Sequence, residues 1–157
     1  MFNLWSVAHY ILHKCGKMST FKLHKLLYYC QAWYMAWNNG SPLFQEDFEA
    51  WVNGPVIREL FNSHKGLYDI DEKTIKTQYI NDINNDIDTE TKEQINRILF
   101  FYNRKSPLSL VSKSHSELPW QKARKGINSL DLSDNITNKK DIYEYYKGKN
   151  ITELSME

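Results

Sequence analysis

Cysteine is scarce in this sequence, and its few glycines are scattered. Cys15 and Cys30 are the two cysteines among 157 residues, and both fall within apolar helical patterns. The sequence therefore has no Cys-x-x-Cys pair, and its six glycines form no phosphate-binding loop. A chain of this length can bury a core without disulfides or metals. We expect two reduced, buried thiols, as in a cytoplasmic protein, and no cofactor.

Neither sign of charge is in excess, and long apolar runs are missing. Lysine and arginine number 20 against 19 acidic residues, for a net charge of +1. Attraction to nucleic acid or to an anionic membrane usually needs a clear positive excess, so neither partner is expected, although a local basic patch is not excluded. No apolar run approaches the roughly 18 residues of a membrane span, and no signal peptide is apparent. The composition predicts one cytoplasmic domain over residues 1–157.

Residues 21–37 form the strongest pattern in the chain. Apolar side chains recur there at the i, i+3, i+4, i+7 spacing of a helix, and from Leu26 onward they surround it almost completely. The open face of this helix is predicted to carry Lys22, Lys25, Tyr29 and Gln31. We therefore predict a mainly α fold, a compact helical domain around this central buried helix.

The remaining elements are predicted from periodicity, caps and breakers. Helices are expected at residues 3–14, 55–62 and 88–104, after Ser106-Pro107, and from Asn135 or Thr137 to Lys147. Residues 43–44 and 48–52 are expected to pair as a small two-stranded β-hairpin. Residues 66–87 and 116–134 are predicted to be surface loops, and residues 150–157 are expected to fray.

Candidate chemistry is sparse, and each candidate has a simpler structural interpretation. His9 and His13, spaced i, i+4, could share a metal ion, but no third ligand has a recognisable spacing, so no metal is predicted. His115 follows Ser114, yet no nucleophile-elbow pattern supports a hydrolase, and a structural histidine is preferred. A helix beginning at Pro55 could bind an anion at its free N–H groups, although a plain turn is commoner.

Aromatic residues are more abundant than one small core would ordinarily need, at 14% of the chain. Tyrosine and tryptophan side chains left at a surface are typical anchors of protein interfaces. Trp120 is flanked by Lys122, Arg124 and Lys125, a mixture that suits single-stranded nucleic acid. It equally suits a buried tryptophan whose charged neighbours are solvated, which is the commoner arrangement.

Three segments together resemble the Panacea antitoxin domain, a family that includes SocA-type antitoxins and phage-associated GepA-like proteins. They are residues 22–34 (KLHKLLYYCQAWY), 49–56 (EAWVNGPV) and 115–120 (HSELPW). The resemblance extends over nearly the whole chain, and the three segments are specific as a set although each alone is weak. It implies a mostly helical domain with a small β element, no catalytic activity, and a structural motif at His115, Glu117 and Trp120.

The resemblance also implies partners. Members of the family typically neutralise a protein toxin encoded beside them, and SocA-type members also deliver the toxin to a proteolytic machine. A cognate protein toxin is thus the implied partner, with a cytosolic protease complex as a second partner if this chain acts as an adaptor.

We place the partner-binding surface on the open face of the central helix and the glycine-proline turn that follows. There, polar and aromatic residues interrupt an otherwise apolar helix. The residues are Lys22, Lys25, Tyr29, Trp51, Asn53, Gly54, Pro55 and Val56. Several of them could instead recur in the family because they hold the fold. Two alternative functions stay open: a phage-encoded regulatory or nucleic-acid-binding protein, and a hydrolase that uses His115.

Overall fold

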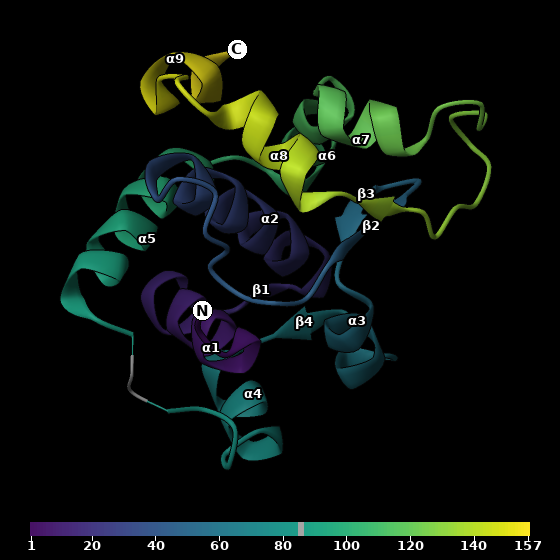
Figure 1. The fold of residues 1–157 in the computed structure, drawn as a ribbon. Coiled ribbons are helices and arrows are strands. Elements are labelled where there is room, and N and C mark those ends of the chain that lie inside the picture. Colours follow the sequence, from purple (N-terminus) through teal and green to yellow (C-terminus); the bar gives the residue numbers. More distant parts are fainter. Residues whose placement is uncertain (85–86) are drawn as a thin grey trace.

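The computed structural model describes residues 1–84 and 87–157, in which helices dominate and short strands form two small sheets (Figure 1). The elements in chain order are α1 (Leu4–Cys15), β1 (Met18–Ser19), α2 (Thr20–Trp37), β2 (Phe48–Trp51), β3 (Gly54–Val56), α3 (Arg58–His64), β4 (Asp69–Ile70), α4 (Glu72–Gln78), α5 (Thr89–Tyr102), α6 (Pro107–His115), α7 (Leu118–Ala123), β5 (Ile136–Thr137), α8 (Lys139–Tyr146) and α9 (Ile151–Met156). The mainly α fold class is confirmed.

Helix α2 is the centre of the structure. It begins where the Ser19 hydroxyl accepts a hydrogen bond from the Lys22 backbone N–H at 3.0 Å, which satisfies one free donor of the first turn. Helices α1, α5, α6 and α8 and strand β3 all contact it, and the indole of Trp33, about one turn before its end, is fully buried. The prediction of a central buried helix is therefore confirmed.

Capping residues set the starts of the other long helices. Asn3 caps α1, Asp88 caps α5 and Ser106 caps α6, each through a side-chain oxygen that accepts a backbone N–H two or three residues later. Pro107 follows in the first turn of α6, where its missing N–H has no helical partner to lose. These helices begin within a residue of their predicted starts.

The predicted hairpin is wrong in its pairing. Strand β2 pairs antiparallel with β3, Trp51 opposite Gly54, and on its other side with β5, Phe48 opposite Thr137. Residues 43–44 are not a strand, because the buried Gln31 side chain takes their backbone groups. Its Oε1 accepts the Leu43 N–H at 2.6 Å and its Nε2 donates to the Phe44 carbonyl at 2.9 Å.

The helix predicted at residues 55–62 begins three residues later than expected. Pro55 lies in β3, at the edge of the three-stranded sheet, a position that tolerates a residue without an N–H. Helix α3 starts at Arg58, so the anion site proposed for a helix beginning at Pro55 does not exist.

Both predicted surface loops contain secondary structure. In the first, β4 pairs with β1, and α4 packs its buried Ile75 toward α1. Residues 85–86, which belong to the same prediction, lie outside the described residues. In the second, α7 buries Trp120. These helices have six or seven residues, too few for a helical period to stand out in the sequence.

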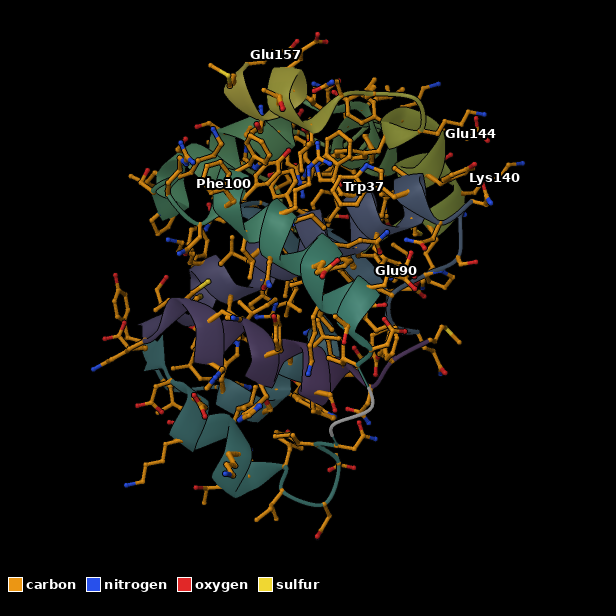
Figure 2. The ribbon with its side chains drawn as sticks, turned by 90° about the vertical axis from the view of Figure 1, so that its left-hand side faces the viewer. Trp37, Glu90, Phe100, Lys140, Glu144 and Glu157 are labelled. Atoms are coloured by element: carbon orange, nitrogen blue, oxygen red, sulfur yellow. The ribbon has the colours of Figure 1, made fainter. Side chains whose placement is uncertain are left out.

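The prediction that residues 150–157 fray is also wrong. They form α9, which is capped by Asn150 and lies against α5 (Figure 2). Ile151 is only 2% exposed, and Leu154 is buried beside it. Two apolar anchors in a segment of eight residues are enough to hold a short helix against a packed neighbour.

Replacing Ile151 by alanine is expected to lower the free energy of unfolding by about 2 kcal/mol, since it leaves a cavity beneath α9. Glu153→Ala, on the exposed side of the same helix, should change it by less than about 0.5 kcal/mol. Urea denaturation of the two variants measures the difference. Equal, small effects would mean that α9 contributes no packing energy.

Candidate functional site

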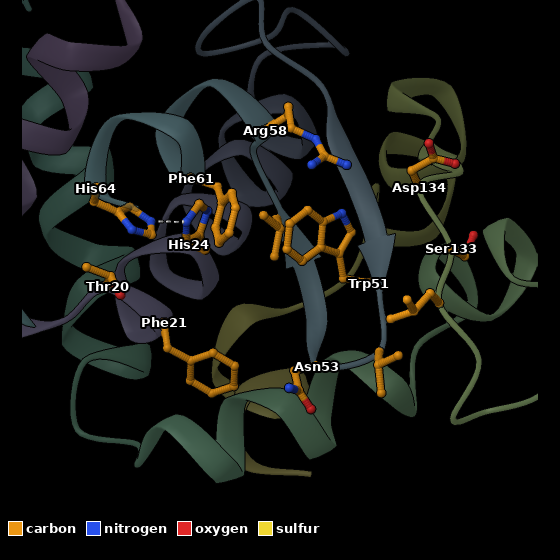
Figure 3. Close-up of a pocket in the computed structure, with 13 residues that line it drawn as sticks. Thr20, Phe21, His24, Trp51, Asn53, Arg58, Phe61, His64, Ser133 and Asp134 are labelled. Atoms are coloured by element: carbon orange, nitrogen blue, oxygen red, sulfur yellow. Dashed lines mark hydrogen bonds between the residues drawn. The ribbon is translucent and has the colours of Figure 1, made fainter. Parts of the chain in front are cut away.

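A pocket of about 660 Å³ lies at the end of the three-stranded sheet (Figure 3). It lies between the start of α2, the β2–β3 turn, α3, and residues 132–134. Its walls are apolar, and they are formed by Phe21, Trp51, Val52, Val56, Phe61 and Leu132. Apart from its two histidines, the pocket lining contains two ionisable residues, Arg58 and Asp134. The pocket thus suits an apolar side chain.

The turn between β2 and β3 is held by side chains from two neighbouring helices. Gly54 has φ +99°, a conformation that L-residues with a side chain rarely adopt. The Lys25 ammonium donates to the Pro55 carbonyl at 3.0 Å, and the Trp120 indole N–H donates to the Trp51 carbonyl at 3.0 Å. Helices α2 and α7 therefore fix the turn that carries Trp51 into the pocket wall.

Trp51 is fixed further by a charged pair on its outer side. Its indole N–H donates to the Glu49 carboxylate at 2.9 Å, and the Arg58 guanidinium donates to the same oxygen at 2.9 Å while lying 4.8 Å above the indole ring. The Phe61 ring packs edge-on against the indole at 4.9 Å. The largest aromatic wall of the pocket is thus preorganised.

Two buried histidines form the floor of the pocket. The Nε2 atoms of His24 and His64 lie 2.8 Å apart (Figure 3). The Ile57 backbone N–H donates to His24 Nδ1 at 3.1 Å. His24 must therefore carry its proton on Nε2 and donate it to His64. Burial lowers the pKa of both imidazoles, with neighbouring Lys25 adding to the effect on His24. The floor is polar but uncharged.

The sequence did not reveal this pair. His24 falls on the apolar side of a helix, and 40 residues separate it from His64. The signal that could have found it is a histidine inside an otherwise apolar stripe, which needs a buried hydrogen-bond partner.

Lys25 was expected on an open face, and that expectation is wrong. Its side chain is 0% exposed. The ammonium nitrogen donates to the Pro55 carbonyl and lies 4.6 Å from the centroid of the Phe21 ring. Burial lowers the pKa of Lys25 from 10.5 to about 7. The lysine holds the turn instead of facing a partner.

Tyr29 and Gln31 are likewise buried, not open. The Tyr29 ring stacks on Tyr102 at 4.1 Å, and its hydroxyl donates to the Glu117 carboxylate at 3.3 Å. Lys22 is half-buried, and its ammonium donates to the Asn103 carbonyl at 2.6 Å. None of these three side chains lines the pocket.

The predicted residues that belong to the β2–β3 turn do lie at or next to the pocket. Trp51, Asn53 and Val56 line the pocket. Gly54 and Pro55 are buried in the strand just behind it. The structure therefore brings together only the turn residues of the predicted surface. His24, Phe61 and His64 also line the pocket, and the sequence analysis did not predict them.

The late motif at His115, Glu117 and Trp120 lies under the turn. The His115 ring stacks on Trp120 at 3.9 Å, and Glu117, 2% exposed, accepts hydrogen bonds from the hydroxyls of Tyr146 and Tyr29. Burial raises the pKa of Glu117 from 4.5 to about 7, against the lowering effect of the two tyrosine hydroxyls. This motif joins α6 and α7 to the core.

The hydrolase alternative gains no support from this geometry. The Ser114 hydroxyl donates to the Val111 carbonyl and the Ser116 hydroxyl to the Lys113 carbonyl, so both are engaged with their own helix. The His115 imidazole stacks on an indole instead of bonding to either serine. A nucleophile activated by a base needs a hydrogen bond between the two.

The His9 and His13 pair is bridged by a carboxylate. Glu72 of α4 lies 2.8 Å from His13 Nδ1 and 3.5 Å from His9 Nε2. Within residues 1–84 and 87–157, no group of three or more histidine, cysteine or acidic side chains could hold a metal ion. No helix in this part of the chain is long and apolar enough to cross a membrane.

Comparison with known proteins identifies the family. The family described as "Antitoxin SocA-like, Panacea domain" matches residues 23–121, more than half of the chain. The chain belongs to the SocA-like Panacea antitoxin family. A curated relative of this Panacea domain, the antitoxin SocA of Caulobacter vibrioides (strain NA1000 / CB15N), is 30% identical over 157 aligned residues, with 90% of this chain and 82% of that protein covered. No solved structure matches the chain.

The Panacea match covers most of the site described above. It includes nearly all of α2, the β2–β3 turn, α3 and the His115 to Trp120 motif. Residues 132–134, which close one side of the pocket, lie beyond the matched segment. Thr20 and Phe21, at the start of α2, lie just before the matched segment, so the pocket combines a floor from the family segment with lining residues from both sides of it.

Proposed function

We propose that this Panacea domain is an antitoxin that neutralises a cognate protein toxin by binding it directly. The pocket beside the β2–β3 turn is the proposed docking site, and it receives an apolar side chain of the toxin. The observation that carries this proposal is a rigid aromatic wall above an uncharged floor, on a domain whose family is described as antitoxin SocA-like. Well-packed pockets with tryptophan walls are where binding energy concentrates in protein interfaces.

Binding, and not catalysis, is the function that the pocket supports. In the His24–His64 pair, one nitrogen of each ring is used by the other ring and His24 Nδ1 is used by Ile57, so neither imidazole is free to act as a general base without breaking the pair. We accordingly propose a non-enzymatic protein. The free thiols of Cys15 and Cys30 suit the reducing cytoplasm, where we place the protein.

Co-expression with the product of the neighbouring gene tests the proposal. Rescue of growth together with a stable complex is the expected result. Rescue without a complex, lost in protease-deficient cells, would show that the chain acts as an adaptor for proteolysis instead. Absence of both toxicity and a complex would contradict the proposal and favour the phage-encoded regulator, which a steep salt dependence of DNA affinity would then identify.

Trp51→Ala is expected to weaken binding of that gene product by about 2 kcal/mol, roughly 30-fold in Kd, because it removes the largest wall of the pocket. Phe100→Ala is the matched control, since Phe100 is an exposed aromatic residue on α5, away from the pocket (Figure 2). Isothermal titration calorimetry measures both affinities, and circular dichroism melts check that both variants fold. Equal affinities would place the toxin on another face.

A further inference from the structure

One end of the pocket carries an exposed carboxylate. Asp134 belongs to the segment that connects α7 to β5, and it lines the pocket. Figure 3 shows it at the opposite end of the lining from His64, with Trp51 between them. The pocket therefore has an uncharged histidine floor at one end and a negative charge at the other.

The cation at this end of the pocket, Arg58, is already neutralised. Its guanidinium donates to both carboxylate oxygens of Glu49, at 3.2 and 2.9 Å. This hydrogen bonding is the main cause that raises the pKa of Arg58, and the nearby charges of Asp134 and Glu59 add to it. One cation thus lies among three carboxylates, of which it pairs with one.

The negative charge extends beyond Glu59. Burial raises the pKa of Glu46, and the neighbouring carboxylates of Glu59 and Asp47 add to that effect. Asp47 is paired with Lys139. Within residues 1–84 and 87–157, no salt bridge engages Glu46, Glu59 or Asp134. We name these last three residues the acidic rim.

The acidic rim is a local excess of negative charge in a chain whose net charge is +1. Arg124, at the start of the segment that carries Asp134, does not neutralise the rim, because it is buried and donates to backbone carbonyls. Carboxylates held near one another repel, and a partner of opposite charge relieves this repulsion when it binds. The rim therefore favours a cation in whatever occupies the pocket.

We propose that the toxin segment bound in this pocket carries a lysine or arginine next to its apolar side chain. The apolar side chain packs against Trp51, and the cation faces the acidic rim. This inference rests on the proposed function and adds to it the charge of the partner. Complementary charge around an apolar anchor accelerates association and disfavours wrong partners. The same rim repels the phosphates of a nucleic acid.

Surface plasmon resonance with the immobilised product of the neighbouring gene tests the acidic rim. Asp134→Asn combined with Glu59→Gln should lower the association rate constant about fivefold at about 0.05 M salt. At about 0.5 M salt the loss should be less than about twofold, because screening removes the attraction. The dissociation rate constant should change little at either salt concentration, since it depends mainly on contacts inside the pocket.

Glu93→Gln combined with Glu153→Gln is the matched control. It makes the same change in net charge at exposed positions of α5 and α9, outside the pocket lining. Its association rate constant should stay within about 1.5-fold of that of the unsubstituted chain. All four substitutions replace an exposed carboxylate by its amide, and circular dichroism melts check that both variants fold.

The outcomes separate this inference from the proposed function. If the product binds and Trp51→Ala weakens the complex, but the rim and control variants associate equally fast, the toxin uses the pocket without a basic side chain. That result overturns this inference and leaves the proposed function standing. Faster association of the rim variant would reveal an acidic partner and also overturns the inference. No binding by the unsubstituted chain overturns both.

Discussion

Gly54→Ala is expected to lower the free energy of unfolding by about 4 kcal/mol, more than a typical single substitution. Two costs add. The backbone at φ +99° disfavours any side chain, and a Cβ at this position would lie 2.9 Å from the Ser114 hydroxyl and 3.0 Å from Cε of Lys25. Neither neighbour can withdraw easily, since Lys25 holds the Pro55 carbonyl and Ser114 holds that of Val111. Equilibrium urea denaturation measures the loss.

Gly148→Ala is the matched control for Gly54→Ala. Gly148 also has a positive φ, +71°, but a Cβ there meets no atom within 4 Å, so only the backbone cost of about 1 kcal/mol remains. Adding Ser114→Ala to Gly54→Ala should recover part of the stability by removing the closer contact. If Gly54→Ala lowers the free energy of unfolding no more than Gly148→Ala does, the turn has room to shift. The hydrogen bond from Lys25 to the Pro55 carbonyl then holds the turn less firmly than its geometry indicates.

Glu117→Gln is expected to change how stability depends on pH. The pKa of Glu117 is about 7 in the folded protein, above the ordinary value of 4.5, because the carboxyl is buried. Between these two pH values the folded state binds more protons than the unfolded state, so this group lowers wild-type stability as pH rises through that window. The variant has no ionisable group at this position. The free energy of unfolding of the variant, relative to that of the wild type, should therefore rise by about 3 kcal/mol from pH 4.5 to pH 8.5.

Two measurements check the role of Glu117. Urea denaturation of wild type and variant near both pH values gives the relative gain directly. Carbon NMR of the Glu117 carboxyl in the wild type should show a midpoint near 7. A midpoint near 4.5, together with parallel stability profiles, would show that the hydroxyls of Tyr29 and Tyr146 stabilise the ionised carboxylate enough to offset its burial.

The elements that could be predicted from the sequence are those whose pattern is long and local. The 18 residues of α2 contain enough helical periods to be unmistakable, and the caps at Asn3, Asp88 and Ser106 are read from single residues. The strand pairing could not be predicted, because it depends on Gln31 capturing the backbone at residues 43–44. A polar side chain in a helix carries no sign of which distant carbonyl it will meet.

Contacts between residues far apart in the sequence are also the reason why most of the candidate site could not be predicted. Lys25 looks solvent-facing in the sequence, because lysine is almost never fully buried without a partner. Its partner is the Pro55 carbonyl, 30 residues away, which no local pattern reveals. The glycine-proline turn could be located from its own residues, whereas the floor under it depends on His24 and His64 meeting across the fold.

The placement of Trp51 also supplies the protein with an optical reporter. Trp33 and Trp120 are buried in the core, and Trp5 and Trp37 lie away from the pocket, so their emission should stay constant when a ligand binds there. Trp51 alone among the tryptophans lines the pocket, with one face under the Arg58 guanidinium. Filling the pocket should shift its fluorescence to shorter wavelength, so occupancy can be followed in unlabelled protein at nanomolar to micromolar concentrations.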